Sequence, residues 1–285
     1  MALRWNDNLL SRANKMSDDR LAGLDAARVR EAMLAAADAA AKLTLAGFRT
    51  PLAVENKWTA GFDPVTAADR DAETAVRAVL ADRFPDHGII GEEWAPKASG
   101  SDFNWIVDPI DGTRAFISGV PVWGTLIGLM HRGRAIAGLM AQPYTGEMWI
   151  AIGGAGEFIR HGAATPLRTS GATELAGAKM TATSPDLFTR LGTDYSAEWN
   201  RIFAATLQTR WGLDCYGYCL LASGSIDLVV EPALKDVDIA PLIPIVEAAG
   251  GVITTWDGGP AEQGGNCVAA ATPELHEAAL RVIRG

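Results

Sequence analysis

The sequence is poor in cysteine and histidine and has no long apolar run. Its three cysteines, Cys215, Cys219 and Cys267, cannot all pair, and a chain of this size does not need disulfide bonds, so we expect them to be thiols of the core. The four histidines are scattered and supply no zinc-binding pattern. No apolar run reaches the roughly 18 residues needed to cross a bilayer. Charged residues interrupt the N-terminal segment where a secretory signal needs an apolar core, so we expect a cytoplasmic protein with no membrane contact.

Positive charge is also scarce. The formal net charge is −9 at pH 7, and no cluster of lysine or arginine stands out. This argues against nucleic acid as a partner, because a nucleic-acid-binding surface must neutralise phosphates. A small phosphorylated metabolite would also be repelled by the overall field unless the site reverses the sign of the charge locally. Divalent cations held by carboxylates would reverse it.

The sequence lacks three common catalytic and nucleotide-binding motifs. A glycine cluster near Gly154 fails the dinucleotide-binding fingerprint, because Ile159 stands where the last glycine is required. Neither a P-loop nor a Gly-x-Ser-x-Gly elbow occurs. The chemistry must therefore come from other residues.

The composition, with 48% hydrophobic and 21% charged residues, is that of a globular protein. An alanine-rich helical period over Leu21–Ala46 is followed by a second helix that ends before Pro85 and by several strand-like runs up to residue 152. Strands and helices alternate beyond about residue 165. We expect an α/β protein with an α+β subdomain over 1–150, which carries most of the metal ligands, and an α/β subdomain over 151–285.

The most informative segment, residues 105–114, reads Trp-Ile-Val-Asp-Pro-Ile-Asp-Gly-Thr-Arg. It places two carboxylates, Asp108 and Asp111, just past an apolar strand, where hard cations bind. Pro109 cannot extend a strand pairing, so we expect the chain to leave the sheet abruptly and to expose the Ile110 carbonyl. The segment therefore predicts a cation site at a strand end.

The residues after Asp111 predict an anion site beside these cations. Gly112 tolerates almost any backbone conformation, and Thr113 opens a short apolar stretch. A helix that begins here would aim free backbone N–H groups at an anion. A phosphate group fits this description.

Two further segments place acids at the ends of apolar elements. Glu92 and Glu93 follow the strand-like run Ile89-Ile90. Asp238 lies at the start of an apolar helix predicted over Ile239–Ala249, a position that the helix dipole favours. Mg²⁺ prefers oxygen ligands of this kind, and two ions bridged by one carboxylate would activate a water molecule and stabilise a leaving alkoxide.

Together these segments resemble the inositol monophosphatase-like superfamily of metal-dependent phosphomonoesterases. The shared motifs occur in order over nearly the whole chain: Asp63-Pro-Val-Thr66 with Asp69, Gly91-Glu92-Glu93, Asp108-Pro-Ile-Asp111-Gly112-Thr113, and Asp238-Ile-Ala240 before Gly250-Gly251. The resemblance implies a layered αβαβα sandwich, two or three Mg²⁺ ions and a homodimer.

The resemblance also assigns roles to individual residues. It implies metal ligands at Glu92, Asp108, Asp111, Asp238 and the Ile110 carbonyl. It implies that Asp63 pairs with Thr113 to orient the attacking water, which makes Asp63, Thr113 and the ligand Glu92 the catalytic residues. The N–H groups of Gly112 and Thr113 would bind the phosphate. For Asp63, a turn and helix cap is the alternative role.

Two stretches, Gly119–Ile127 and Trp211–Tyr218, look most like the histidinol-phosphate phosphatase branch of this superfamily. Histidinol phosphate carries an ammonium group that inositol phosphate lacks, so its site needs an extra acid at the organic end of the substrate. Asp214 and Glu231 are the candidates. Their alternative roles are a solvated loop acid for Asp214 and a structural ion pair for Glu231.

Other functions remain open at this point. Asp238 follows Lys-Asp-Val, whereas generic family members usually carry Trp-Asp and the histidinol branch often Lys-Pro-Tyr-Asp. An inositol-1-monophosphatase and a 3′-phosphonucleotide or fructose-bisphosphate phosphatase are the alternatives within the superfamily. A non-catalytic regulator that binds protein or RNA is the alternative from another class, although such a protein has no physical need for mutually repelling acids.

Overall fold

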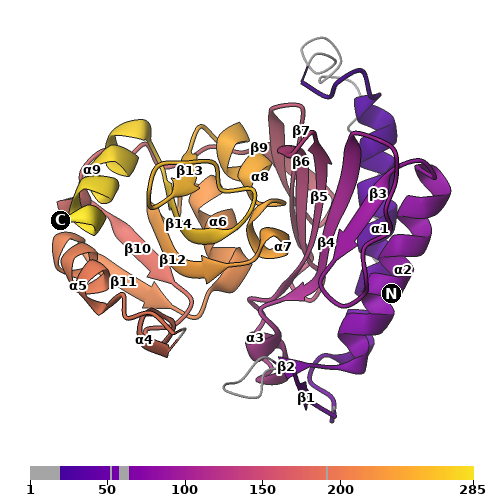
Figure 1. The fold of residues 1–285 in the computed structure, drawn as a ribbon, viewed down its shortest axis with the longest axis horizontal. Helices are drawn as coiled ribbons and strands as arrows, with labels where there is room; N and C mark the ends of the chain where they lie inside the picture. The colour runs from indigo at the N-terminus through magenta and orange to yellow at the C-terminus, as the bar shows by residue number, and fades with distance from the viewer. Residues whose placement is uncertain (1–19, 52, 58–63, 191) are drawn as a thin grey trace.

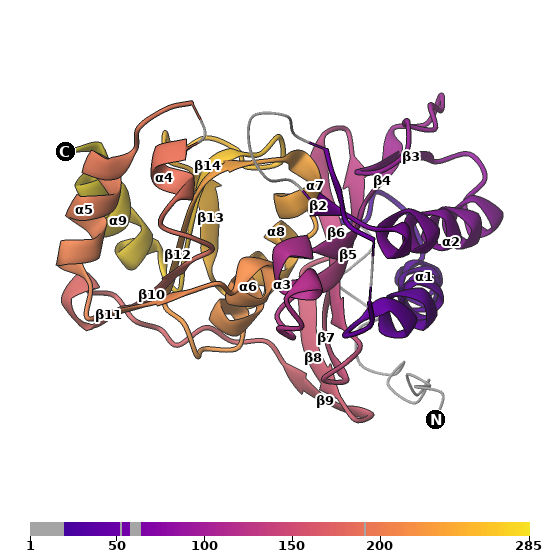
Figure 2. The ribbon, with the colours of Figure 1, turned by 90° about the horizontal axis from the view of Figure 1, so that it is seen from below.

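The computed structural model describes residues 20–51, 53–57, 64–190 and 192–285, and its layers alternate between helices and sheets (Figure 1). Helices α1 (Ala26–Gly47) and α2 (Ala67–Arg83) cover the outer face of the first sheet. Helices α6 (Asp214–Ala222) and α8 (Ile243–Ala248) lie between the two sheets, as Figure 2 also shows. Helices α5 (Ser196–Ala205) and α9 (Pro273–Arg284) cover the second sheet. The expected αβαβα arrangement is confirmed.

The first sheet has seven strands in sequential order. They are β3 (Gly88–Gly91), β4 (Phe103–Asp111), β5 (Gly124–His131), β6 (Arg134–Gln142), β7 (Glu147–Ile152), β8 (Ala155–Arg160) and β9 (Ala163–Pro166). Strand β3 pairs with β4 in parallel and the other pairs are antiparallel. Trp105 and Val107 join the core under α1 and α2, whereas Ile106 joins the core between the sheets, as the alternation of side chains along a strand requires. Strand β4 is therefore buried on both faces.

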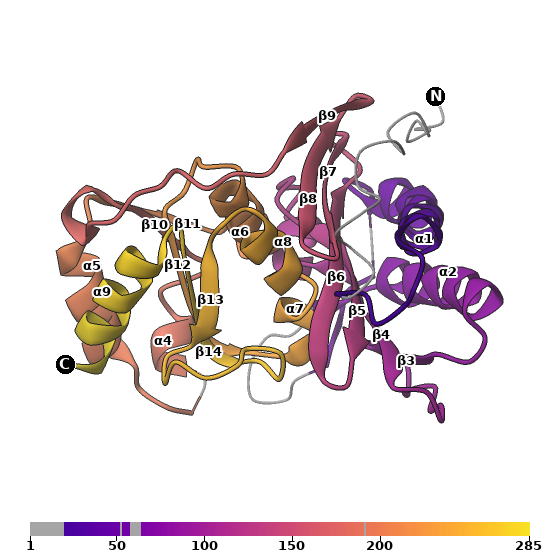
Figure 3. The same cartoon turned by 90° about the horizontal axis from the view of Figure 1, so that it is seen from above.

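The glycine cluster near Gly154, just past the expected subdomain boundary, is part of this sheet. Gly153 and Gly154 form the turn between β7 and β8, and both have φ in the left-handed region, at 57° and 85°, which suits a two-residue hairpin turn. Strands β8 and β9 pair onward from β7 (Figure 3). A division near residue 150 therefore cuts the first sheet, which runs to Pro166. The division of the chain into two subdomains stays a prediction.

The second sheet has five strands in the order β11-β10-β12-β14-β13. They are β10 (Lys179–Ala182), β11 (Gln208–Trp211), β12 (Leu228–Leu234), β13 (Val252–Thr255) and β14 (Gly265–Ala270). Strands β11 and β12 are parallel to β10, and the pairs made by β14 are antiparallel. All three cysteines are buried and free, as expected of core thiols. A further short hairpin pairs β1 (Glu55–Asn56) with β2 (Pro64–Val65).

Two expected helix bounds are wrong for identifiable reasons. Helix α1 begins at Ala26 rather than Leu21, because Asp25 caps it by accepting from the Ala27 N–H at 3.0 Å. The helix expected over Ile239–Ala249 is two helices, α7 (Asp236–Ile239) and α8. Pro241 lies in the break and has no N–H to donate.

The break between α7 and α8 allows the chain to approach β6 closely. Gly138 of β6 lies against the carbonyl of Pro241, and a Cβ at this position would clash with it. The turn is thereby packed directly on the first sheet, with α7 just before it. No described helix is both long and apolar enough to span a membrane.

Candidate active site

Three carboxylates from distant parts of the chain meet at the ends of β4 and α7. Asp108, Asp111 and Asp238 each offer an oxygen atom, and these atoms all lie within 4.8 Å of one another. Asp108 is 2% exposed. The structure thus brings together three of the four predicted carboxylate ligands, from both halves of the chain.

The end of β4 differs from the expectation that Pro109 would end the strand. The strand continues to Asp111, and its register with β5 shifts between Asp108 and Asp111. This irregularity accommodates the proline, whose carbonyl accepts a hydrogen bond from the Thr125 hydroxyl at 2.8 Å. The Ile110 N–H donates a hydrogen bond to Asp108 Oδ1 at 3.0 Å. The Asp108 carboxylate is therefore held in place by the strand's own backbone.

The turn after β4 has the expected shape. Gly112 has a φ of 81°, in the left-handed region, and directly precedes α3 (Thr113–Ile117). A side chain is strained in this conformation. The residue that follows, Thr113, donates from its hydroxyl to the Ile110 carbonyl at 3.0 Å.

Backbone N–H groups orient the other two carboxylates. The Cys215 N–H at the start of α6 donates to Asp111 Oδ2 at 2.8 Å. The Lys235 N–H donates to Asp238 Oδ2 at 2.8 Å. Helix α6 is thus tied to strand β4 through Asp111, whereas the Asp238 carboxylate is held by the N-terminal cap of its own helix, α7.

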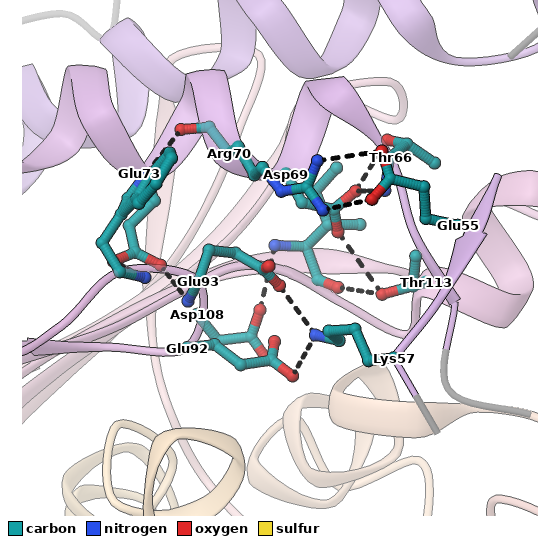
Figure 4. Close-up of polar contacts among 12 residues, drawn as sticks. Glu55, Lys57, Thr66, Asp69, Arg70, Glu73, Glu92, Glu93, Asp108 and Thr113 are labelled. Carbon is teal, nitrogen blue, oxygen red and sulfur yellow. Dashed lines mark hydrogen bonds and ion pairs between the residues drawn. The ribbon is translucent and has the colours of Figure 1, made fainter. Parts of the chain in front are cut away.

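The fourth predicted ligand, Glu92, lines the same cavity but is not one of the three clustered carboxylates. Its Oε1 accepts from Lys57 Nζ at 3.0 Å and from Lys235 Nζ at 2.9 Å. Lys57 also pairs with Glu93 at 2.8 Å (Figure 4). Burial alone would raise the pKa of Glu92, but the ammonium groups of Lys235 and Lys57 lower it below its usual value. Neither lysine was singled out from the sequence for this contact.

Among the described residues, Asp69 provides a carboxylate beside Thr113. The Thr113 hydroxyl lies 3.5 Å from Asp69 Oδ1. The other oxygen of Asp69 accepts from the Thr66 N–H at 2.8 Å and from the Thr66 hydroxyl at 2.6 Å. Asp63, the partner predicted for Thr113, lies outside the described residues. The capping signal Thr-x-x-Asp was visible in the sequence, but it gave no indication that the same acid reaches Thr113.

Burial and mutual repulsion make the clustered acids suited to a bound cation. Burial raises the pKa of Asp108 well above its usual value, and the carboxylates of Glu92, Asp111 and Asp238 raise it further. Burial, with Asp238 and Asp214, does the same for the pKa of Asp111. Such acids ionise together only beside positive charge. Carboxylate and carbonyl oxygens suit a hard cation such as Mg²⁺, so these residues fit the predicted metal.

Two further acids line the same cavity, which has a volume of about 280 Å³. Burial raises the pKa of Asp214 to about 6, against the opposing charge of Arg114. Glu231 is 2% exposed, and burial raises its pKa to about 8. Its Oε1 accepts from the Thr183 N–H at 2.7 Å and the Thr183 hydroxyl at 2.9 Å, whereas Oε2 has no hydrogen-bond partner among the described residues. Two acidic groups are thus available to an organic group bound in the cavity.

Comparison with known proteins identifies the family. The model of the inositol monophosphatase family matches residues 25–285. The chain is 37% identical to a chloroplastic bifunctional phosphatase of Arabidopsis thaliana, over 86% of this chain and 72% of the relative. It is 38% identical to a histidinol-phosphatase of Chlorobaculum parvum, over 78% of this chain and 83% of the relative. A solved inositol monophosphatase from Zymomonas mobilis has a TM-score of 0.79 at 38% identity, over 92% of this chain and all of the other.

The family match spans both halves of the chain and all the motifs that form the carboxylate cluster. The family acts on small phosphorylated substrates and depends on Mg²⁺. The chain therefore belongs to the inositol monophosphatase family and is a phosphoric monoester hydrolase.

Proposed function

We propose that the protein hydrolyses L-histidinol phosphate to L-histidinol and phosphate, a reaction of histidine biosynthesis. The observation that carries this proposal is the pair of acids, Asp214 and Glu231, that line the cavity in addition to the clustered carboxylates. An ammonium group placed beside them would gain charge-assisted hydrogen bonds. It would also supply a partner for Glu231 Oε2, which has none among the described residues. An uncharged polyol would bring no counter-charge to either acid.

In this proposal Glu92, Asp108, Asp111, Asp238 and the Ile110 carbonyl bind two or three Mg²⁺ ions. When bound, these ions supply an activated water molecule and charge stabilisation of the leaving group. The N–H groups of Gly112 and Thr113 hold the phosphate. The Thr113 hydroxyl, which lies between Asp69 and the Ile110 carbonyl, holds the attacking water in line. Positioning and electrostatics of this kind suffice for phosphoryl transfer without a covalent nucleophile.

Other family substrates compete with this choice. Identity of 38% to both a histidinol-phosphatase and a solved inositol monophosphatase does not separate the two esters. Inositol-1-phosphate, a 3′-phosphonucleotide and fructose bisphosphate are therefore the alternatives. The retained carboxylates argue against the non-catalytic regulator. The homodimer, the number of ions and the cytoplasmic location stay predictions.

A panel of esters tests the proposal. We expect kcat/KM with Mg²⁺ to be at least about tenfold higher for L-histidinol phosphate than for inositol 1-phosphate, fructose 1,6-bisphosphate or 3′-phosphoadenosine 5′-phosphate, since a hydrogen bond to a charged group contributes roughly 1.5–3 kcal/mol. Phosphate release is the measurement, with EDTA as the control for metal dependence. A higher kcat/KM for inositol 1-phosphate would reject L-histidinol phosphate as the proposed substrate. Absence of turnover with every ester would instead favour the non-catalytic regulator.

A further inference from the structure

Helix α2 carries a buried acid that the proposed mechanism does not use. Glu73 is 0% exposed and faces the segment 91–94, which contains Glu92 (Figure 4). Its Oε2 accepts from the Glu93 N–H at 2.6 Å, and its Oε1 accepts from the Trp94 N–H at 3.3 Å. One carboxylate therefore binds the two backbone N–H groups that directly follow Glu92.

Arg77, one turn further along α2, completes this contact. Its Nε donates to Glu73 Oε1 at 2.6 Å, and another guanidinium N–H donates to the Trp94 carbonyl at 2.9 Å. The pair thus holds N–H and carbonyl groups of the same short segment. Residues four apart lie on one face of a helix, so α2 presents Asp69 to Thr113 and the Glu73–Arg77 pair to the segment 91–94.

Gly91, the residue before Glu92, leaves room for the Glu73 carboxylate because it has no side chain. A Cβ on Gly91 would clash with Glu73 Oε1 and would lie 2.8 Å from the Arg77 guanidinium. The Glu73 carboxylate therefore lies directly against the backbone at the end of β3. Burying an ionised carboxylate is costly unless it is paired and hydrogen-bonded, and here the arginine and two N–H groups offset that cost.

We propose that Glu73 is a positioning residue for the metal site: with Arg77 it fixes the backbone of segment 91–94 and so aims the Glu92 carboxylate into the cavity. The inference rests on the proposed role of Glu92 as a metal ligand. Groups that hold a metal ligand in place without touching the ion affect the affinity of the site for the metal. If Glu73 served only to pack α2 on the sheet, its loss would lower stability and leave metal affinity unchanged.

The test is Mn²⁺ binding to the full chain, measured by calorimetry, with the melting temperature of the metal-free protein recorded alongside. Glu73→Gln keeps the shape but loses one acceptor, and we expect Mn²⁺ affinity to fall about 10- to 100-fold. Val76→Ala is the matched control, because Val76 is a fully buried residue of the same helix. It should lower the melting temperature without changing Mn²⁺ affinity. Unchanged affinity in Glu73→Gln would overturn the inference.

A double-mutant cycle separates this inference from the proposed function. In a Glu92→Gln background the Glu73→Gln change should alter Mn²⁺ affinity less than about twofold, because coupling is lost with the ligand. Equal effects of Glu73→Gln with and without Glu92 would reject the positioning role and leave the ligand set intact. If Glu92→Gln alone leaves Mn²⁺ affinity unchanged, the proposed ligand set fails first.

A milder variant covers the case in which Glu73→Gln does not fold. Arg77→Lys keeps a cation beside Glu73 but loses the planar guanidinium group, whose second N–H donates to the Trp94 carbonyl. We expect it to weaken Mn²⁺ binding about three- to tenfold, because the hydrogen bond from Arg77 to the Trp94 carbonyl is lost. Wild-type affinity in Arg77→Lys would count against the inference.

Discussion

Asp108→Asn should abolish phosphate release and, without metal, raise the melting temperature of the protein. The carboxylate is central to the proposed site, since its oxygen lies within 4.8 Å of oxygens of Asp111 and Asp238. We expect activity to fall at least about a thousandfold, because metal-bound charge at this position stabilises the transition state. The neutral amide of the variant, by contrast, relieves repulsion among buried acids.

The gain in stability should depend on pH. Burial and neighbouring acids raise the pKa of Asp108 in the folded protein, so the folded state holds this proton more tightly than the unfolded state. The unfolding free energy of the metal-free wild type must therefore fall as the pH rises from the unfolded pKa through the raised folded one. Asparagine does not titrate. The advantage of Asp108→Asn should consequently be larger at pH 8 than at pH 5.

Thermal melting in EDTA and in Mg²⁺ measures this effect. An increase of about 2–4 °C at pH 8 corresponds to roughly 1 kcal/mol for a chain of this size. Added Mg²⁺ should reverse the order, because it stabilises the wild type alone through binding to the folded state. A variant that is less stable than the wild type in EDTA at pH 8 would show that repulsion does not dominate the cluster.

Asp214→Asn should impair hydrolysis of L-histidinol phosphate selectively. The pKa of Asp214 is about 6, so the carboxylate is ionised at pH 8 and offers a charge to the substrate's ammonium group. We expect kcat/KM for this ester to fall about 10- to 100-fold, as the loss of a hydrogen bond to a charged group implies. Turnover of inositol 1-phosphate should change less than about threefold, because that ester carries no cation.

The matched control is Asp257→Asn, which removes the same formal charge from an exposed turn after β13. It should leave both esters unaffected and so exclude an effect of net charge. Equal losses of both esters in Asp214→Asn would remove this residue from substrate selection. Glu231 would then be the remaining candidate for the ammonium group.

The local features of the fold and of the site could be predicted from the sequence. Asp108 and Asp111 were predicted as cation ligands because acids that follow an apolar strand have a defined position on it, whereas Asp238 was assigned as a ligand through the family resemblance. The αβαβα layers followed from the family resemblance. The turn at Gly112 followed from the conformational freedom of glycine.

Long-range contacts could not be read in this way. The capping signal of Asp69 is local, whereas its approach to Thr113 depends on how α2 packs on β4. The contact of Glu73 with segment 91–94 likewise depends on tertiary packing, because the Glu73 carboxylate lies directly against the backbone at Gly91. The break between α7 and α8 was missed because apolar periodicity continues across Pro241.

The location of bound metal is the most direct test of the proposed carboxylate site. Crystals of the protein soaked in Mn²⁺ give an anomalous signal that identifies the ion without reference to activity. We expect Mn²⁺ between the carboxylates of Asp108, Asp111 and Asp238, with Glu92 released from Lys57 and Lys235 and directed to an ion. Mn²⁺ bound only elsewhere, with these carboxylates empty at saturating concentration, would contradict this expectation.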